Sequence, residues 1–69
     1  MSKEQVGIGQ KIRKCRLEKE LSQEKLARLA DLAFPTISKI ESGETPNPTI
    51  DTVKKIAAVL EISVDDLIK

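Results

Sequence analysis

The stretch from Ser22 to Gly43, SQEKLARLADLAFPTISKIESG, constrains the fold of this chain more than any other part of it. Its apolar residues recur at roughly three- to four-residue spacing on both sides of a short break at Asp31 and Leu32. The stretch is therefore predicted to form two short helices joined by a tight turn. The apolar side chains expected on their shared inner side are Leu26, Ala27, Ala30, Leu32, Ile37 and Ile40.

The second of these helices is predicted to turn its polar residues to the opposite side. The helical period gathers on that side Pro35, Ser38, Lys39 and Ser42, with Phe34 at the leading end. Two helices arranged in this way present one of them to a partner, and the major groove of DNA is wide enough to admit it. We therefore interpret the stretch as a helix-turn-helix and the rest of the chain as its support.

The length and composition indicate one small globular domain. A chain of 69 residues is close to the lower limit at which a hydrophobic core can stabilise a fold without disulfides or metal. The content of 39% hydrophobic and 33% charged residues excludes a disordered or membrane-embedded chain. No apolar run approaches a membrane span, and the start, MSKEQVGIG, contains no apolar targeting segment. We expect a cytoplasmic protein with no membrane partner.

Residue types that carry catalytic chemistry are scarce. The single cysteine, Cys15, has no histidine in the chain to work with, which excludes a zinc site and a cysteine-histidine nucleophile pair. At helical spacing after Ile8 and Ile12, Cys15 is expected to pack in the core. The acidic residues form no calcium-loop spacing, and no glycine-rich phosphate loop is present. The sequence predicts no enzyme, no cofactor and no bound metal.

The charge is unevenly distributed. The net charge is only +1, which is low for a DNA-binding domain. However, residues 1–28 hold eight basic and four acidic side chains, whereas residues 44–69 hold three basic and five acidic ones. A domain with one basic and one acidic end can orient on a polyanion although it is nearly neutral overall.

Periodicity and capping residues predict an all-α fold of five helices. Ser22 and Thr49 are suited to cap helix N-termini, and Gly43 is suited to end a helix in the left-handed conformation. The last helix is expected to turn inward the side chains of Val64, Leu67 and Ile68. The predicted helices span about residues 7–19, 23–30, 35–42, 50–60 and 64–69.

Two charged residues fall on inner sides of the predicted helices. Arg16 lies close to the apolar stripe of the first helix, and Glu41 lies beside Ile37 in the third. Because an unpaired buried carboxylate is costly, we predict a salt bridge between Arg16 and Glu41. Gln23 falls in the first turn of its helix, where the free amides attract a phosphate. It is either a phosphate contact or a solvated surface residue.

Phe34, the only aromatic residue, allows two interpretations. If it faces inward it is the largest core residue, and if it faces outward it is suited to contact an apolar group such as a thymine methyl. Pro35 disfavours helical angles at the residue before it, so the helix begins at Phe34 or Pro35, and Ala33 would cap it weakly. Lys39, one turn further on, could donate to guanine or meet a phosphate.

The chain resembles the phage Cro and lambda-repressor-like helix-turn-helix family, also called XRE-type, over about residues 8–68. The residues that carry the resemblance are Arg16, Leu21-Ser22-Gln23, Leu26-Ala27, Ala30, Thr36-Ile37-Ser38-Lys39-Ile40-Glu41, Gly43, Asn47-Pro48-Thr49 and Ser63-Val64-Asp65-Asp66-Leu67. This resemblance implies a compact five-helix lambda-repressor-like domain whose third helix enters the major groove of double-stranded DNA. It further implies a sequence-specific transcriptional regulator, most simply a repressor, that binds its operator as a homodimer.

The resemblance also implies roles for individual residues. The residues matching Arg16 and Glu41 form the interhelical salt bridge in that family. The residues matching Phe34, Pro35 and Lys39 face bases in that family, and Ser38 is expected to face a base as well because the helical period places it on the same side. The residue matching Gln23 meets a phosphate in that family. We expect further phosphate contacts from Thr36, Ser42, Asn47, Lys14 and Lys25.

The chain departs from the family pattern at several turns. Asp31 and Glu20 stand where glycine is common, and Ala33 stands where Ser or Thr usually caps the third helix. The loop that begins GETPNPT lacks the Lys or Arg that relatives often place against the DNA backbone. We therefore expect low DNA affinity for each monomer.

The sequence also allows a second function and indicates a surface for dimer formation. The same fold could serve as a protein-interaction module, antitoxin-like or regulator-binding, that docks a partner through Phe34 and the GETPNPT loop. A two-fold contact around Val59, Ile62 and Val64 would set two recognition helices about one DNA turn apart, although these residues could equally be core. The chain is either a small regulator or a piece of a longer one.

Overall fold

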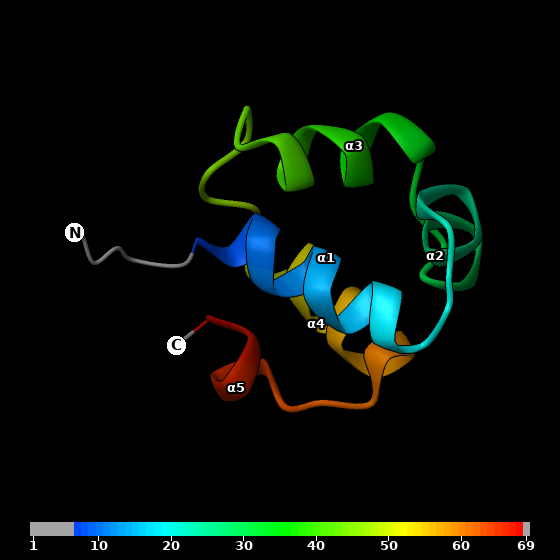
Figure 1. The fold of residues 1–69 in the computed structure, drawn as a ribbon. Coiled ribbons are helices and arrows are strands. Elements are labelled where there is room, and N and C mark those ends of the chain that lie inside the picture. Colours follow the sequence, from blue (N-terminus) through cyan, green and yellow to red (C-terminus); the bar gives the residue numbers. More distant parts are fainter. Residues whose placement is uncertain (1–6, 69) are drawn as a thin grey trace, which may run out of the picture.

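A computed structural model describes residues 7–68 of the chain (Figure 1). Five helices follow one another, and residues 7–68 contain no strand. They are α1 (Ile8–Glu18), α2 (Gln23–Leu29), α3 (Phe34–Ser42), α4 (Ile50–Leu60) and α5 (Val64–Ile68). The predicted bounds agree to within about a residue at each end, although residue 69, the predicted end of the last helix, lies outside the described residues. No helix in residues 7–68 is long and apolar enough to cross a membrane.

Side-chain caps begin three of the helices. The Ser22 hydroxyl oxygen accepts a hydrogen bond from the Lys25 N–H at 3.0 Å, and Thr49 Oγ1 accepts one from the Thr52 N–H at 3.2 Å. Ser63 Oγ caps α5 in the same way. Such a cap satisfies a backbone donor that has no partner within the helix. These caps explain why the helices begin where the sequence predicts.

The N-terminus of α3 lacks a side-chain cap, as predicted. Ala33 is the N-cap residue and makes no side-chain hydrogen bond, and the helix begins at Phe34, the earlier of the two starts predicted from the sequence. Pro35 is tolerated in this first turn because its missing N–H would have had no acceptor within the helix. Phe34 is therefore a helical residue and not the cap.

Each of the four connections between the helices contains one residue in the left-handed backbone conformation. Gly43 has a φ of 90°, and Glu20, Asp31 and Glu61 each have a φ of 59°. This conformation is predicted from the sequence at Gly43, and Glu20 and Asp31 stand where related proteins often have glycine, whereas no sequence signal marks Glu61. Residues with a Cβ adopt it at a cost of roughly 1–2 kcal/mol, which the packing of the helices must offset.

The core lies between the five helices and includes every inward residue predicted for the helix-turn-helix except Leu32, which packs half-buried at its edge. Cys15 also packs half-buried against the core, as expected. The prediction for Ile68 is wrong, because its side chain is 53% exposed. Leu67 is buried, and the next residue of a helix points about 100° away from it. The core residues are Ile12, Leu26, Ala27, Ala30, Ile37, Ile40, Val53, Ile56, Ala57, Leu60 and Leu67.

Helix α3 lies along one edge of the molecule, at the top of Figure 1, and packs mainly on α1 and α2. Gly9 in the first turn of α1 meets the backbone at the end of α3. A Cβ at this position would overlap the carbonyl oxygen of Ile40 and lie 3.1 Å from the Cα of Glu41. Glycine thus lets α1 approach the end of α3 directly, which leaves the opposite side of α3 facing away from the other helices.

Candidate nucleic-acid interface

The outward side of α3 is accessible along its whole length. Its inner residues Ile37 and Ile40 are buried, whereas Phe34 at the amino end is 47% exposed. The interpretation of Phe34 as a core residue is therefore wrong. The other residues of this side are Pro35, Lys39 and Ser42, which are exposed, and Thr36 and Ser38, which are half-buried.

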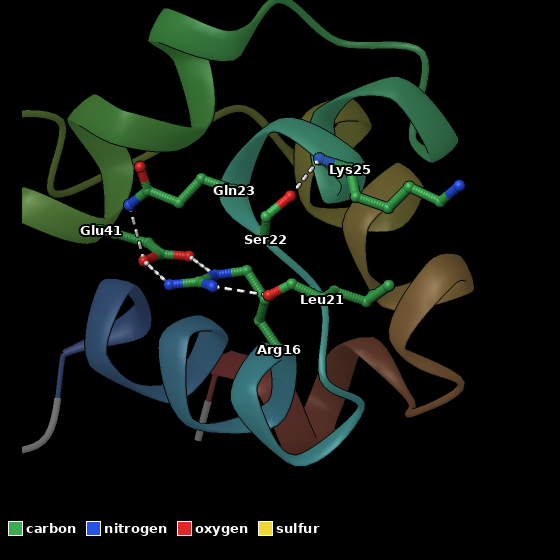
Figure 2. A network of polar contacts seen from close by, with 6 residues as sticks. All are labelled: Arg16, Leu21, Ser22, Gln23, Lys25 and Glu41. Atoms are coloured by element: carbon green, nitrogen blue, oxygen red, sulfur yellow. Dashed lines mark hydrogen bonds and ion pairs between the residues drawn. The ribbon is translucent and has the colours of Figure 1, made fainter.

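A buried ion pair fixes the carboxyl-terminal half of α3 to α1. Arg16 Nε donates to Glu41 Oε2 at 2.7 Å, and Arg16 Nη2 donates to Glu41 Oε1 at 3.0 Å (Figure 2). Only 8% of the Arg16 side chain and 3% of the Glu41 side chain are exposed. The pair that the sequence predicts is thus formed, with the two parallel bonds that a planar guanidinium makes to a carboxylate.

Further contacts surround this ion pair. Arg16 Nη1 donates to the carbonyl oxygen of Leu21 at 2.7 Å, which ties the pair to the connection between α1 and α2. The hydrogen bonds to Glu41 raise the pKa of the Arg16 guanidinium above its ordinary value, while burial opposes this rise. Arg16 is therefore a cation around neutral pH.

Gln23 joins the same network from α2, which sequence reasoning missed. Its Nε2 donates to Glu41 Oε1 at 2.9 Å, and Figure 2 shows its amide oxygen pointing away from Glu41. A signal for a further partner was available in the sequence. A buried carboxylate can accept about four hydrogen bonds, which is more than Arg16 alone donates to Glu41. Glu41 thereby connects α1, α2 and α3. One N–H of the Gln23 amide is engaged, and its second N–H is left to donate elsewhere.

The loop after α3 is folded back on the helix. Ser42 Oγ donates to the carbonyl oxygen of Lys39 at 3.0 Å and accepts from the Glu44 N–H at 3.3 Å. The Thr45 N–H also donates to the Lys39 carbonyl. Ser42 is thus held by local bonds, and its hydroxyl group must release the Lys39 carbonyl oxygen before it can donate to a phosphate. Between this loop, α3 and the start of α4 lies an open groove of about 290 Å³ whose lining includes Pro35, Thr36, Lys39, Asn47 and Thr52.

The structure brings some of the predicted contact residues together and leaves others apart. Thr36 and Lys39 share the groove with Asn47 from the following loop. Lys25 is exposed on α2, and Figure 2 shows its side chain extending away from the Arg16–Glu41 pair. Lys14 is exposed on α1. Within residues 7–68, no group of three or more His, Cys, Asp or Glu side chains could hold a metal ion.

Known proteins share this arrangement. A model of the helix-turn-helix family matches residues 12–67, which is more than half of the chain. The chain belongs to the helix-turn-helix family. This membership confirms the resemblance to XRE-type proteins that the sequence motifs carry, and with it the predicted all-α, five-helix fold.

Relatives within the helix-turn-helix family include bacterial regulators. The HTH-type transcriptional regulator SinR of Bacillus subtilis is 41% identical over 61 residues, which cover 88% of this chain and 55% of SinR. Control protein C.BamHI of Bacillus amyloliquefaciens is 46% identical over 62 residues, which cover 88% of this chain and 75% of that protein. The chain thus spans about half the length of SinR.

The similarity to SinR extends to the three-dimensional structure. The crystal structure of SinR in complex with DNA has a TM-score of 0.85 to this structure at 42% identity. The match covers 87% of this chain and 95% of that one. This helix-turn-helix domain therefore has the fold of a domain that has been crystallised with DNA.

Proposed function

We propose that this protein is a sequence-specific, DNA-binding transcriptional regulator whose helix α3 enters the major groove. The observation that carries the proposal is the asymmetry of α3. Its inner side is buried in the core and tied down by the Arg16–Glu41 pair, while its outer side is accessible throughout. A rigid helix with one free side is the form in which helix-turn-helix proteins read base edges. The DNA-bound structure of the relative SinR supports the same assignment.

The exposed side of α3 supplies the proposed base contacts, and its neighbours supply the proposed phosphate contacts. The base contacts are Phe34, Pro35, Ser38 and Lys39. The phosphate contacts are Gln23, Thr36, Ser42, Asn47, Lys14 and Lys25. Phosphate contacts position the domain, whereas base contacts select the sequence.

Gln23 suits the phosphate role for two reasons. It is the first residue of α2, where the backbone N–H groups and the helix dipole favour an anion. Its side chain is also oriented before DNA arrives, because Glu41 engages one of its amide N–H groups. The charge of Glu41 does not oppose a nearby phosphate strongly, since Arg16 neutralises it.

We also propose that the regulator acts as a homodimer, most simply as a repressor that occludes a promoter. The dimer surface proposed from the sequence is the region between α4 and α5. Val59, Ile62 and Val64 are half-buried there and pack against the core, so each keeps some accessible surface for a second copy. We also propose a cytoplasmic location, because a protein that binds DNA must lie in the compartment that holds the DNA.

The second candidate is a protein-interaction module. The exposed phenyl ring of Phe34 supports this reading, because a large apolar side chain in water is also suited to dock on a protein. The loop after α3 supports it too, since it offers no basic residue between Glu41 and Lys54. In this reading the partner would be a cognate toxin or another regulator.

Titration with duplex DNA separates the two functions. The fluorescence anisotropy of labelled random-sequence duplex should rise on addition of the protein at low salt. Two of the six proposed phosphate contacts, Lys14 and Lys25, are cations, so the slope of log affinity against log salt should be about −2 for each domain, and about −3 with Lys39 on a phosphate. Lys39→Ala and Gln23→Ala should weaken binding, whereas Lys19→Ala should not.

Lys19 is a suitable control for the loss of a lysine. It forms an ion pair with Glu61 at 3.0 Å, on the connection between α4 and α5 and not on α3. An absence of binding at low salt would overturn the DNA-binding proposal and favour the protein-interaction module. Equal weakening by Lys19→Ala and Lys39→Ala would show that α3 is not the contact surface.

A further inference from the structure

The outer side of α3 is divided into two chemically different halves. Its amino end presents Phe34, 47% exposed, followed by the exposed ring of Pro35. The remainder presents hydroxyl groups and the ammonium group of Lys39. Lys39 can donate to guanine or phosphate, but neither of the first two residues carries a polar side-chain group. The start of α3 therefore cannot read a base by side-chain hydrogen bonds.

The amino end of a recognition helix is the part that reaches base edges. In the major groove, the apolar group that projects from the base pairs is the methyl group at C5 of thymine, and the nitrogen and oxygen atoms of the base edges are hydrogen-bond donors or acceptors. A phenyl ring against a donor or acceptor would desolvate it without a replacement bond, which is unfavourable. Contact with a C5-methyl group instead removes the exposed ring of Phe34 from water without desolvating a hydrogen-bond donor or acceptor of the base.

We propose that Phe34 makes the protein a reader of the C5-methyl group of a pyrimidine in the major groove. This inference rests on the proposed function and adds the feature of DNA that the start of α3 selects. Because the phenyl ring offers no hydrogen-bonding group, it responds to the methyl group itself. The ligand class is therefore a 5-methylpyrimidine, thymine or 5-methylcytosine, at one position of each half-site.

The experiment removes the methyl group from the DNA and the ring from the protein. Duplexes are first selected from a random-sequence pool, and each thymine of the selected sequence is then replaced singly by deoxyuridine. At one position in each half-site, this loss should weaken binding of the unmodified protein about fourfold, the effect of one buried CH₂-sized group. At that position, a duplex with 5-methylcytosine should bind about fourfold more tightly than one with cytosine.

Variants assign the effect to the ring. Phe34→Ala should bind thymine and deoxyuridine duplexes equally, and cytosine and 5-methylcytosine duplexes equally. Because Phe34 lies on the surface, its removal is not expected to unfold the domain, which circular dichroism checks. Ile68→Ala is the matched control, since it truncates a side chain of similar exposure on α5. It should keep the full preference for the methyl group.

The possible results have distinct meanings. Sequence-selective binding that ignores the methyl group at every position would overturn this inference and leave the proposed function standing. A methyl preference that persists in Phe34→Ala would also overturn it. Unchanged DNA affinity in Phe34→Ala would overturn it as well, because the ring would then make no contribution to DNA binding. If no duplex binds at low salt, the proposed function fails and this inference fails with it.

Discussion

Replacing Arg16 by methionine should destabilise the fold by about 3–5 kcal/mol, the cost of removing one partner from a buried ion pair. The substitution deletes both bonds to Glu41 and the bond to the Leu21 carbonyl oxygen. It leaves a carboxylate that is 3% exposed with the neutral amide of Gln23 as its remaining partner. Glu41→Gln should cost a comparable amount, because it leaves the buried guanidinium without a counter-charge.

This loss is large relative to the whole stability of the domain. For 69 residues the usual range is about 3–10 kcal/mol. Unfolding in urea, followed by far-ultraviolet circular dichroism, should therefore show a midpoint lowered by roughly 3 M for a slope near 1 kcal/mol/M. The Arg16→Met, Glu41→Gln double variant should lose less than the sum of the two single variants, because no charge is then left buried.

Lys19→Ala is the control, because it breaks an ion pair whose side chains are 36% and 77% exposed. That change should cost no more than about 1 kcal/mol.

The raised pKa of Arg16 also predicts how the stability depends on pH. The contribution of the Arg16–Glu41 pair to the free energy of unfolding is fully present below arginine's ordinary pKa, and it is lost only as the pH rises through the pKa of Arg16 in the folded protein. The difference between wild type and Arg16→Met should thus be constant from about pH 7 to pH 9. Losses below about 1 kcal/mol in both single variants would refute the reasoning.

Two further pairs of substitutions test the backbone geometry by urea unfolding. Gly9→Ala should destabilise the domain by about 1–3 kcal/mol because its Cβ would overlap the backbone of α3, whereas Gly7→Ala, with open space around it, should cost less than about 1 kcal/mol. Equal losses would show that α1 does not approach α3 closely. Glu20→Gly should be neutral or stabilise by up to about 1 kcal/mol, whereas Gly43→Ala should destabilise by about 1–2 kcal/mol, because both positions are left-handed. Effects of the same sign at both positions would contradict the assigned backbone angles.

Local signals explain why most of the fold was predictable. Ser22 and Thr49 cap the helices expected of them, and Gly43 ends α3 in the left-handed conformation. The Arg16–Glu41 pair was also predictable, because two opposite charges on inner sides of neighbouring helices need one another.

Other features depend on three-dimensional detail that periodicity does not contain. The direction of Phe34 was ambiguous because a residue in the first turn has no preceding helical residues to establish its side. Ile68 was assigned to the core because α5 is too short for its phase to be read from a repeating pattern. The bond from Gln23 to Glu41 was missed because it depends on how α2 and α3 pack. The DNA contacts and the dimer surface are still predictions.

The most direct test of the account is to map the DNA-contacting residues by NMR. Amide resonances of the isotope-labelled protein would be followed during titration with a selected duplex. The largest shifts should fall on residues 34–42 and on Gln23, with smaller shifts at the proposed dimer contact around Val59, Ile62 and Val64. Large shifts confined to α4 and α5, with α3 unaffected while DNA is bound, would contradict the account.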